Sequence, residues 1–176
     1  MRALALFLAA TTALPLAACA DYGSLSTERI GSAQMKFANG LPAGTVQMFR
    51  NGDNVQVTGA LAGLSAGTHA VHLHTTGTCT APDFTSAGGH LNPEGNTHGS
   101  QSPGGAHLGD MPNFTVTANG AGTFNTTLDG SYSEAVAALF DNDGTAVVVH
   151  AGADDYRTDP AGDAGSRVAC GVVTQG

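Results

Sequence analysis

The sequence has no tryptophan, a single lysine and few charged residues of either sign. Charged side chains make up 11% of the 176 residues, whereas about 25% is typical of globular proteins. Six basic residues stand against fourteen acidic ones, so the net charge is −8. Because a protein that binds phosphate backbones needs a basic face, this composition excludes nucleic acid as a partner. It also disfavours electrostatic binding to anionic membranes.

Beyond the N-terminal segment, no apolar run approaches the about 18 residues that a membrane-spanning helix needs. Residues 1–18 contain one basic residue (Arg2), a short apolar run and then small residues. This arrangement is typical of a secretory signal peptide. Its end reads Leu-Ala-Ala-Cys up to Cys19 and resembles the bacterial lipobox, in which the cysteine is lipidated and becomes the first residue. The alternative is an ordinary signal peptide, cleaved near Ala18 or Ala20, that leaves a spare thiol.

The lipobox interpretation sets the expected organisation of the chain. Residues 1–18 would be a lipoprotein signal peptide, residues 19–31 a lipidated cysteine and polar tether, and residues 32–176 the folded domain. We expect an exported protein that a lipid on Cys19 holds in the bacterial envelope, facing the periplasm. The residue after the cysteine is Ala20 and not aspartate, which resembles the pattern for outer-membrane delivery in a Gram-negative cell.

Short alternations of apolar and polar residues, separated by glycine-rich turns, predict β-strands over most of the domain. Hydrophobic residues make up 41% of the chain and glycine contributes 25 residues, which suits a packed core with many turns. Regularly spaced short strands favour an all-β sandwich or barrel. The expected strands are residues 33–37, 45–49, 55–58, 69–75, 114–117, 122–128, 146–150 and 168–173.

Two glycine-rich stretches, residues 76–112 and 151–166, lack strand patterns. An irregular connection of more than about 15 residues usually carries function. The first stretch contains three of the seven histidines, and an aspartate follows the last of them by three residues. These residues are His90, His98, His107 and Asp110.

The other histidines lie in strand patterns. His72 and His74 form an H-x-H pair, and period two places both rings on one face, about 7 Å apart. His150 ends the most apolar strand. Each histidine alone has a structural explanation, as a hydrogen-bonded ring at a sheet edge or as loop polarity. Seven histidines in a chain poor in aromatic and charged residues need a shared explanation. Imidazole and carboxylate ligands together suit zinc, copper or iron.

Five segments in the same order resemble the copper/zinc superoxide dismutase family. They are residues 69–74 (HAVHLH), 89–93 (GHLNP), 105–113 (GAHLGDMPN), 147–151 (VVVHA) and 162–172 (GDAGSRVACGV). The resemblance covers about residues 32–174. It implies an eight-stranded Greek-key β-sandwich or flattened barrel with two long functional loops. It also implies an enzyme that converts superoxide into oxygen and hydrogen peroxide.

The same resemblance implies one copper and one zinc ion per subunit. The copper ligands would be His72, His74, His90 and His150. The zinc ligands would be His90, His98, His107 and Asp110. His90 would therefore bridge the two ions and pass a proton as copper changes oxidation state. His69 would brace the copper strand without binding metal, and Asp154 would link His72 to His98.

Arg167 would be the second catalytic residue beside His90, because it would attract and orient the superoxide anion. The resemblance also pairs Cys79 with Cys170 in a disulfide, two free thiols being the alternative. The only lysine, Lys36, is far from these segments in sequence, whereas relatives place lysines near the channel. The assembly stays open between monomer and homodimer. An envelope copper and zinc buffer without turnover is the alternative function.

Overall fold

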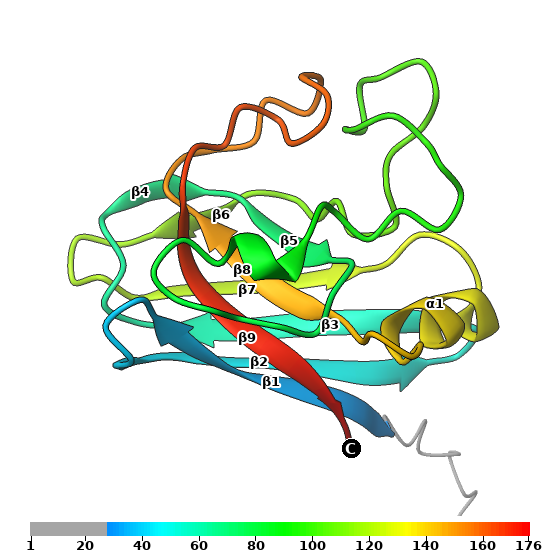
Figure 1. Cartoon of the computed structure of the whole chain (residues 1–176), viewed down its shortest axis with the longest axis horizontal. Helices are drawn as coiled ribbons and strands as arrows, with labels where there is room; N and C mark the ends of the chain where they lie inside the picture. The colour runs from blue at the N-terminus through cyan, green and yellow to red at the C-terminus, as the bar shows by residue number, and fades with distance from the viewer. Residues whose placement is uncertain (1–27) are drawn as a thin grey trace, which may run out of the picture.

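The computed structural model describes residues 28–176, which form a nine-stranded antiparallel sheet with two short helices (Figure 1). The strands are β1 (Arg29–Phe37), β2 (Pro42–Asn51), β3 (Asn54–Leu61), β4 (Gly67–His69), β5 (Val71–His74), β6 (Phe114–Val116), β7 (Gly122–Thr127), β8 (Ala146–His150) and β9 (Arg167–Gln175). The helices are the 3₁₀ turn η1 (Thr85–Ala87) and α1 (Tyr132–Leu139). The predicted signal peptide, Cys19 and most of the predicted tether lie outside the described residues. β1 begins three residues before the predicted domain boundary.

The strands follow the order β4-β6-β7-β3-β2-β1-β9-β8-β5. β4 comes after β3 along the chain but lies beyond β7 and β6, so the connection is of the Greek-key type. The edge strands β4 and β5 are separated by Ala70 alone, and the sheet curls into a nearly closed barrel. The predicted all-β class is confirmed. There are nine strands and not the predicted eight because Ala70 divides the predicted strand 69–75 into β4 and β5. The Ala70 N–H donates to the Gly152 carbonyl (2.8 Å), and the Ala70 carbonyl accepts from the His150 N–H (3.0 Å).

The strands β5 and β8 are buried on both faces. One face fills the barrel core with Val71, Leu73, Val147 and Val149. The other face is outside the barrel, where Val148 packs against Phe84 of the first long loop. Because side chains alternate along a strand, His72, His74 and His150 point to this outer face. The loops therefore cover a layer of histidines on the outside of the barrel.

Two long loops without strands are present, as predicted. Residues 75–113 connect β5 to β6 and residues 151–166 connect β8 to β9. Both loops extend from the same side of the sheet, in green and orange in Figure 1. A disulfide between Cys79 and Cys170, with an S–S distance of 2.03 Å, ties the first loop to β9 and confirms the predicted pairing. In the described part of the chain, no helix is both long and apolar enough to cross a membrane.

Candidate metal centre

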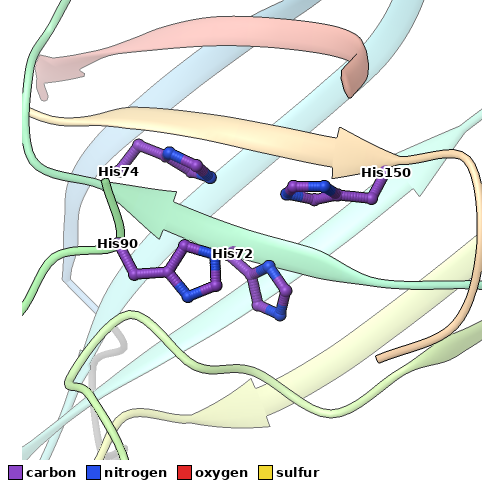
Figure 2. Close-up of side chains that lie close together, drawn as sticks. All are labelled: His72, His74, His90 and His150. Carbon is purple, nitrogen blue, oxygen red and sulfur yellow. The ribbon is translucent and has the colours of Figure 1, made fainter. Parts of the chain in front are cut away.

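Four histidine side chains from three parts of the chain converge on the outer face of the barrel. His72 and His74 come from β5, and His150 comes from the end of β8, which pairs with β5. His90 comes from the first long loop and forms a bridge with His74 across the free edge of β5. Figure 2 shows the four rings turned toward one another. The ring centroids of His72 and His90 are 4.1 Å apart, and those of His74 and His90 are 4.9 Å apart.

Each ring of this group makes a hydrogen bond through one nitrogen and presents the other nitrogen to its neighbours. The bonded nitrogens are Nε2 of His72 to Asp154 (2.9 Å), Nδ1 of His74 to the Gly88 carbonyl (2.9 Å), Nδ1 of His90 to Asp110 (2.7 Å) and Nδ1 of His150 to the Gly165 carbonyl (3.2 Å). Since every bonded partner is an acceptor oxygen, each neutral ring carries its proton on the bonded nitrogen, and a metal bound at Nδ1 of His90 would displace the proton there. The second nitrogen is therefore an unprotonated lone pair.

In residues 28–176, four buried side-chain nitrogen or oxygen atoms have no hydrogen-bond partner, and all four are these second ring nitrogens. They are Nδ1 of His72 and Nε2 of His74, His90 and His150. An unpartnered buried polar atom costs about 1–3 kcal/mol. Four such lone pairs within 4.8 Å of one another fit a single metal cation. Neutral imidazoles of this kind suit copper.

A second group shares His90 and is centred on Asp110. The Oδ1 atom of Asp110 lies 2.7 Å from Nδ1 of His90, 3.1 Å from Nδ1 of His98 and 3.2 Å from Nδ1 of His107. Its Oδ2 atom accepts from the backbone N–H groups of Gly99 (2.8 Å) and His107 (3.0 Å). Ligands about 2.0 Å from zinc in a tetrahedron are about 3.3 Å apart. Three imidazoles and one carboxylate at these separations fit zinc.

Asp154 connects the two groups because it bonds one ring from each, His72 and His98, through the ring nitrogen that faces away from the group. Its Oδ2 accepts from Nε2 of His72 (2.9 Å), and its Oδ1 accepts from Nε2 of His98 (2.9 Å). The backbone of Asp154 is held on both sides by the Asn113 side chain, at 2.8 and 2.9 Å. Gly162 approaches so closely that a Cβ there would lie 1.8 Å from Oδ1 of Asp154. The carboxylate is thus fixed, and it fixes the orientation of both rings.

His69 is buried behind the first group and contributes no nitrogen to it. Its Nδ1 donates to the carbonyl of His150 at 2.7 Å, and its Nε2 lies 3.3 Å from the hydroxyl of Ser65. These contacts join β4 to the end of β8. His69 therefore supports the backbone of His150, which fits the bracing role that the family resemblance implies for it.

The surroundings set the protonation of these groups. Burial lowers the pKa of His74 to about 2 and the pKa values of His90 and His150 to about 4. Burial alone would raise the pKa of Asp110 and Asp154, but hydrogen bonds outweigh it. They lower the pKa of Asp154 to about 2 and hold the pKa of Asp110 below its usual range. At neutral pH the rings of His74, His90 and His150 are neutral and the two carboxylates are ionised, which are the states that bind metal.

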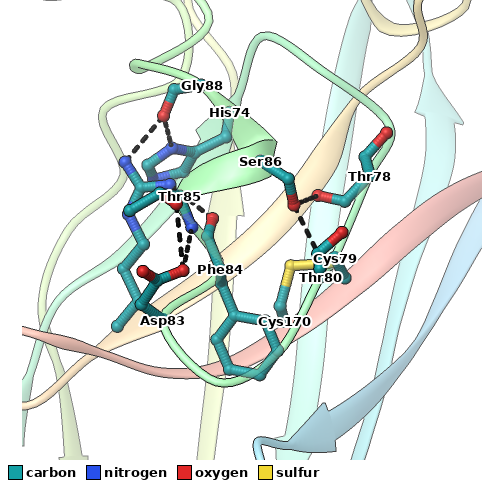
Figure 3. Close-up of a disulfide and its surroundings, with 11 residues drawn as sticks. His74, Thr78, Cys79, Thr80, Asp83, Phe84, Thr85, Ser86, Gly88 and Cys170 are labelled. Atoms are coloured by element: carbon teal, nitrogen blue, oxygen red, sulfur yellow. Dashed lines mark hydrogen bonds between the residues drawn. A yellow bond between two sulfur atoms is a disulfide. The ribbon is translucent and has the colours of Figure 1, made fainter.

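Arg167 lies at the opening of the first group. A hollow of about 470 Å³ is lined by His74, His90, His150 and Arg167, together with Asp159. The Arg167 guanidinium donates to the carbonyls of Phe84 and Gly88, at 2.7 Å each. The Gly88 carbonyl also accepts from His74 (Figure 3). In the described chain, every ion pair with N···O of 4.0 Å or less involves a histidine. Arg167 is thus held by neutral carbonyls.

The structure brings together every side chain that the sequence analysis assigned to the two metals, and Asp154 and Arg167 lie beside them. Four supporting groups were missed: the Phe84 and Gly88 carbonyls that hold Arg167, Asn113 behind Asp154, and Asp159. The Asp159 carboxylate accepts from the backbone N–H of His98 at 2.8 Å. Backbone carbonyls leave no residue-type signal in a sequence. Asn113 lies inside the segment GAHLGDMPN, so its place in that motif was the available signal.

The fold and the two groups define an all-β protein with a two-metal centre. The copper/zinc superoxide dismutase (SODC) family matches residues 42–173. The Cu-Zn superoxide dismutase of Caulobacter vibrioides is 38% identical over 172 residues, which cover 94% of this chain and 98% of that protein. The chain belongs to the copper/zinc superoxide dismutase family. Copper and zinc are therefore its cofactors, and the two groups are the candidate sites for them. We call the first the copper group (His72, His74, His90 and His150) and the second the zinc group (His90, His98, His107 and Asp110), after the metals we propose for them below.

Solved structures agree with this assignment. A superoxide dismutase-like protein from Bacillus subtilis has a TM-score of 0.74 at 32% identity, covering 80% of this chain and 96% of that one. The Cu/Zn superoxide dismutase from Brucella abortus has a TM-score of 0.64 at 25% identity, covering 80% and 97% of the two chains. Residues 1–27 lie outside the described structure, so the fold similarity concerns the barrel and its loops.

Proposed function

We propose that the chain converts two superoxide anions and two protons into dioxygen and hydrogen peroxide, with copper and zinc held as follows. Copper would be bound by His72, His74, His90 and His150, and zinc by His90, His98, His107 and Asp110. The observation that carries the proposal is the set of four unprotonated nitrogens that converge beside Arg167. Copper at these nitrogens supplies one-electron exchange with superoxide, and zinc supplies a fixed positive charge.

His90 is the residue suited to proton transfer. Its Nε2 belongs to the copper group, whereas its Nδ1 faces Asp110 in the zinc group. With Nδ1 committed to the zinc side, Nε2 would hold a proton only while it does not bind copper, and it would release that proton toward the mouth of the hollow that His90 lines. That proton would reach the reduced oxygen species and complete hydrogen peroxide. His90 therefore links the charge of one group to the protonation of the other.

Arg167 is the residue suited to substrate binding. Superoxide is a monoanion and the chain carries a net charge of −8, so capture needs a local positive field at the mouth. Arg167 lines this mouth, and two carbonyls fix its guanidinium. Planar, directed N–H donors suit a small anion. A protein that only stored metal would have no use for an arginine held in this position.

The test is superoxide consumption by the full chain loaded with one copper and one zinc ion, compared with the metal-free protein. We expect Arg167→Ala to lower kcat/KM by about tenfold or more, because a focused field raises on-rates by about 10–10³. Arg157→Ala is the matched control: Arg157 lies in the loop that leads into Arg167, donates to Gln101 at 2.6 Å and does not line the hollow. A loaded protein that consumed no superoxide would favour metal buffering.

We also propose that residues 1–18 are removed and that a lipid on Cys19 anchors the protein to an envelope membrane, facing the periplasm. The support is the lipobox-like end of the segment and the polar residues that follow it. Cys19→Ala should release the protein into the soluble fraction, whereas the unchanged chain sediments with membranes. Continued membrane attachment of the Cys19→Ala protein would overturn the anchor.

A further inference from the structure

Arg167 borders a second hollow as well as the mouth over the copper group. This second hollow, of about 500 Å³, is lined by Arg167, Asp83, Thr85 and Ser166 among others. Asp83 is exposed, whereas Arg167 is partly buried. Arg167 and the Asp83 carboxylate thus line the same hollow, although they are not within ion-pair distance of each other. None of the functions assigned so far uses Asp83.

Asp83 also stabilises the turn that holds Arg167. Its Oδ1 accepts from the backbone N–H of Thr85 at 3.1 Å and from the Thr85 hydroxyl at 2.9 Å (Figure 3). The residue between them, Phe84, has a left-handed backbone with φ of 55°. A bulky residue adopts this conformation only where its surroundings hold it. The Phe84 carbonyl is one of the two that accept from Arg167, so the Asp83 turn fixes the direction of that acceptor.

The charge of Asp83 acts on Arg167, with which it lines the second hollow. Burial lowers the pKa of Arg167, and the negative charge of Asp83 opposes that shift. Hydrogen bonds from Thr85 lower the pKa of Asp83, so the carboxylate is ionised at neutral pH. The other carboxylate near the mouth, Asp159, is bonded to the backbone of the zinc-group residue His98. Asp83 is therefore the carboxylate that can adjust the arginine without touching either metal group.

We propose that Asp83 is a positioning residue for Arg167 that also offsets part of its positive charge, and so limits the capture of anions at the mouth. The two effects oppose each other. Through Thr85 and Phe84 the side chain orients the guanidinium, while its own charge weakens the field that the guanidinium projects. The identity of the anion as superoxide rests on the proposed function, whereas the effect on Arg167 does not.

The size of the charge effect follows from its exposure. Because Asp83 is in contact with solvent, its field is screened by water and salt, with a Debye length of about 8 Å at physiological ionic strength. Removing one such charge near an anion site is expected to change anion capture by about two- to threefold at low ionic strength. The change should disappear at high salt, where exposed charges are screened.

The experiment compares Asp83→Asn, Asp83→Ala and the control Asp141→Asn in the full chain. Asparagine keeps an acceptor for Thr85 and removes the charge, whereas alanine removes both. Asp141 is a matched control: its Oδ1 accepts from the backbone N–H of Gly144 in a similar exposed turn. That turn precedes β8 at the end opposite His150. Two readouts are used, kcat/KM for superoxide against ionic strength, and protection of Arg167 by inorganic phosphate against phenylglyoxal in the metal-free protein.

At low ionic strength we expect Asp83→Asn to raise kcat/KM about two- to threefold and to lower the half-protecting phosphate concentration by a similar factor. Asp141→Asn should match the unchanged chain in both. Asp83→Ala should have a lower kcat/KM and a higher half-protecting phosphate concentration than Asp83→Asn, because the turn under Phe84 is lost. If Asp83→Asn equals Asp141→Asn, or captures anions more weakly than the unchanged chain, the charge role is wrong. If Asp83→Ala equals Asp83→Asn, the positioning role is wrong.

The two readouts separate this inference from the proposed function. A protein that consumes no superoxide, but in which Asp83→Asn strengthens phosphate protection of Arg167, would overturn the proposed function and support the role of Asp83. A protein that consumes superoxide with no effect of Asp83→Asn would do the reverse. Peptide mass mapping assigns the phenylglyoxal adduct to Arg167, so reaction at the other arginines does not affect the result.

Discussion

The two histidine groups share His90 but differ in how their ligand atoms are satisfied. In the zinc group, three imidazole nitrogens face one oxygen of Asp110, and backbone N–H groups hold the other oxygen. In the copper group, four nitrogens face one another and no carboxylate lies among them. One group contains its own negative charge, whereas the other is neutral.

This difference suits the two metals to different tasks. A carboxylate among the ligands offsets part of the charge of a divalent ion. Zinc suits such a site because it has no redox chemistry and stays divalent. A neutral set of imidazoles offsets none of the charge, so it can hold copper in either oxidation state without a fixed partner charge. Asp154 joins the groups through His72 and His98 while lying outside both sets of ligand nitrogens.

The largest loss of turnover is expected for His90→Ala, which removes a ligand that the two groups share and so affects both of them. Outer-shell changes alone cost about 10–100-fold in metal affinity or activity, so loss of a shared ligand should lower turnover by more than about 100-fold. Both metals should bind more weakly. Superoxide consumption and metal content measure the effect, and circular dichroism checks that the barrel is intact. Turnover within a few-fold of the unchanged chain would contradict the assignment of His90.

The next test separates the groups with a matched pair, His150→Ala and His107→Ala. His150 belongs only to the copper group and His107 only to the zinc group. We expect His150→Ala to weaken copper about 100-fold with little change in zinc, and His107→Ala to do the reverse. Chelator competition for each metal gives the affinities. Equal loss of both metals in both variants would mean that the groups act as one indivisible site.

A smaller effect is expected at the link between the groups. Asp154→Asn leaves one acceptor oxygen for two donating rings, so His72 or His98 must face an amide N–H and lose its fixed orientation. Metal affinity should fall by about 10–100-fold, and the metal that falls further identifies the ring that lost its partner. Asp155→Asn is the control, because the neighbouring carboxylate bonds Thr158 and no histidine. Similar losses in both variants would indicate a general loop effect.

Much of this centre could be predicted because period two governs β5 and β8. The alternation that puts Val71 and Leu73 in the core turns His72 and His74 outward together. His150 follows the same alternation in β8. The loop residues have no such periodicity, and their place came from the resemblance to the family. No pattern indicates the carbonyls that hold Arg167, since any residue can supply a carbonyl.

Two parts of the fold differ from the prediction for local reasons. The strand predicted over residues 69–75 is divided because both backbone groups of Ala70 bond the segment around His150 and Gly152. Helix α1 was not predicted at all, although its signal is present. Ser131 and Glu134 form a capping box, with the Ser131 side chain accepting from the Glu134 N–H and the Glu134 carboxylate accepting from the Ser131 N–H. Such a pair before an apolar run marks a helix start.

The smallest expected effect lies in α1, which shares no residue with either metal group and therefore tests whether their difference is local. Hydrogen bonds from Ser131 lower the pKa of Glu134 below its ordinary value of 4.5. Because the folded-state pKa is the lower one, the carboxylate contributes stability that is complete above pH 4.5 and is lost as the pH falls through the folded-state pKa. Glu134→Gln should thus be slightly less stable than the unchanged chain at about pH 6, and the difference should shrink as the pH falls below 4.5, as measured by chemical denaturation. Copper and zinc affinities should not change. A shift in either affinity would show that the two groups depend on the far end of the barrel, and the contrast between them would then not be a property of their own ligands.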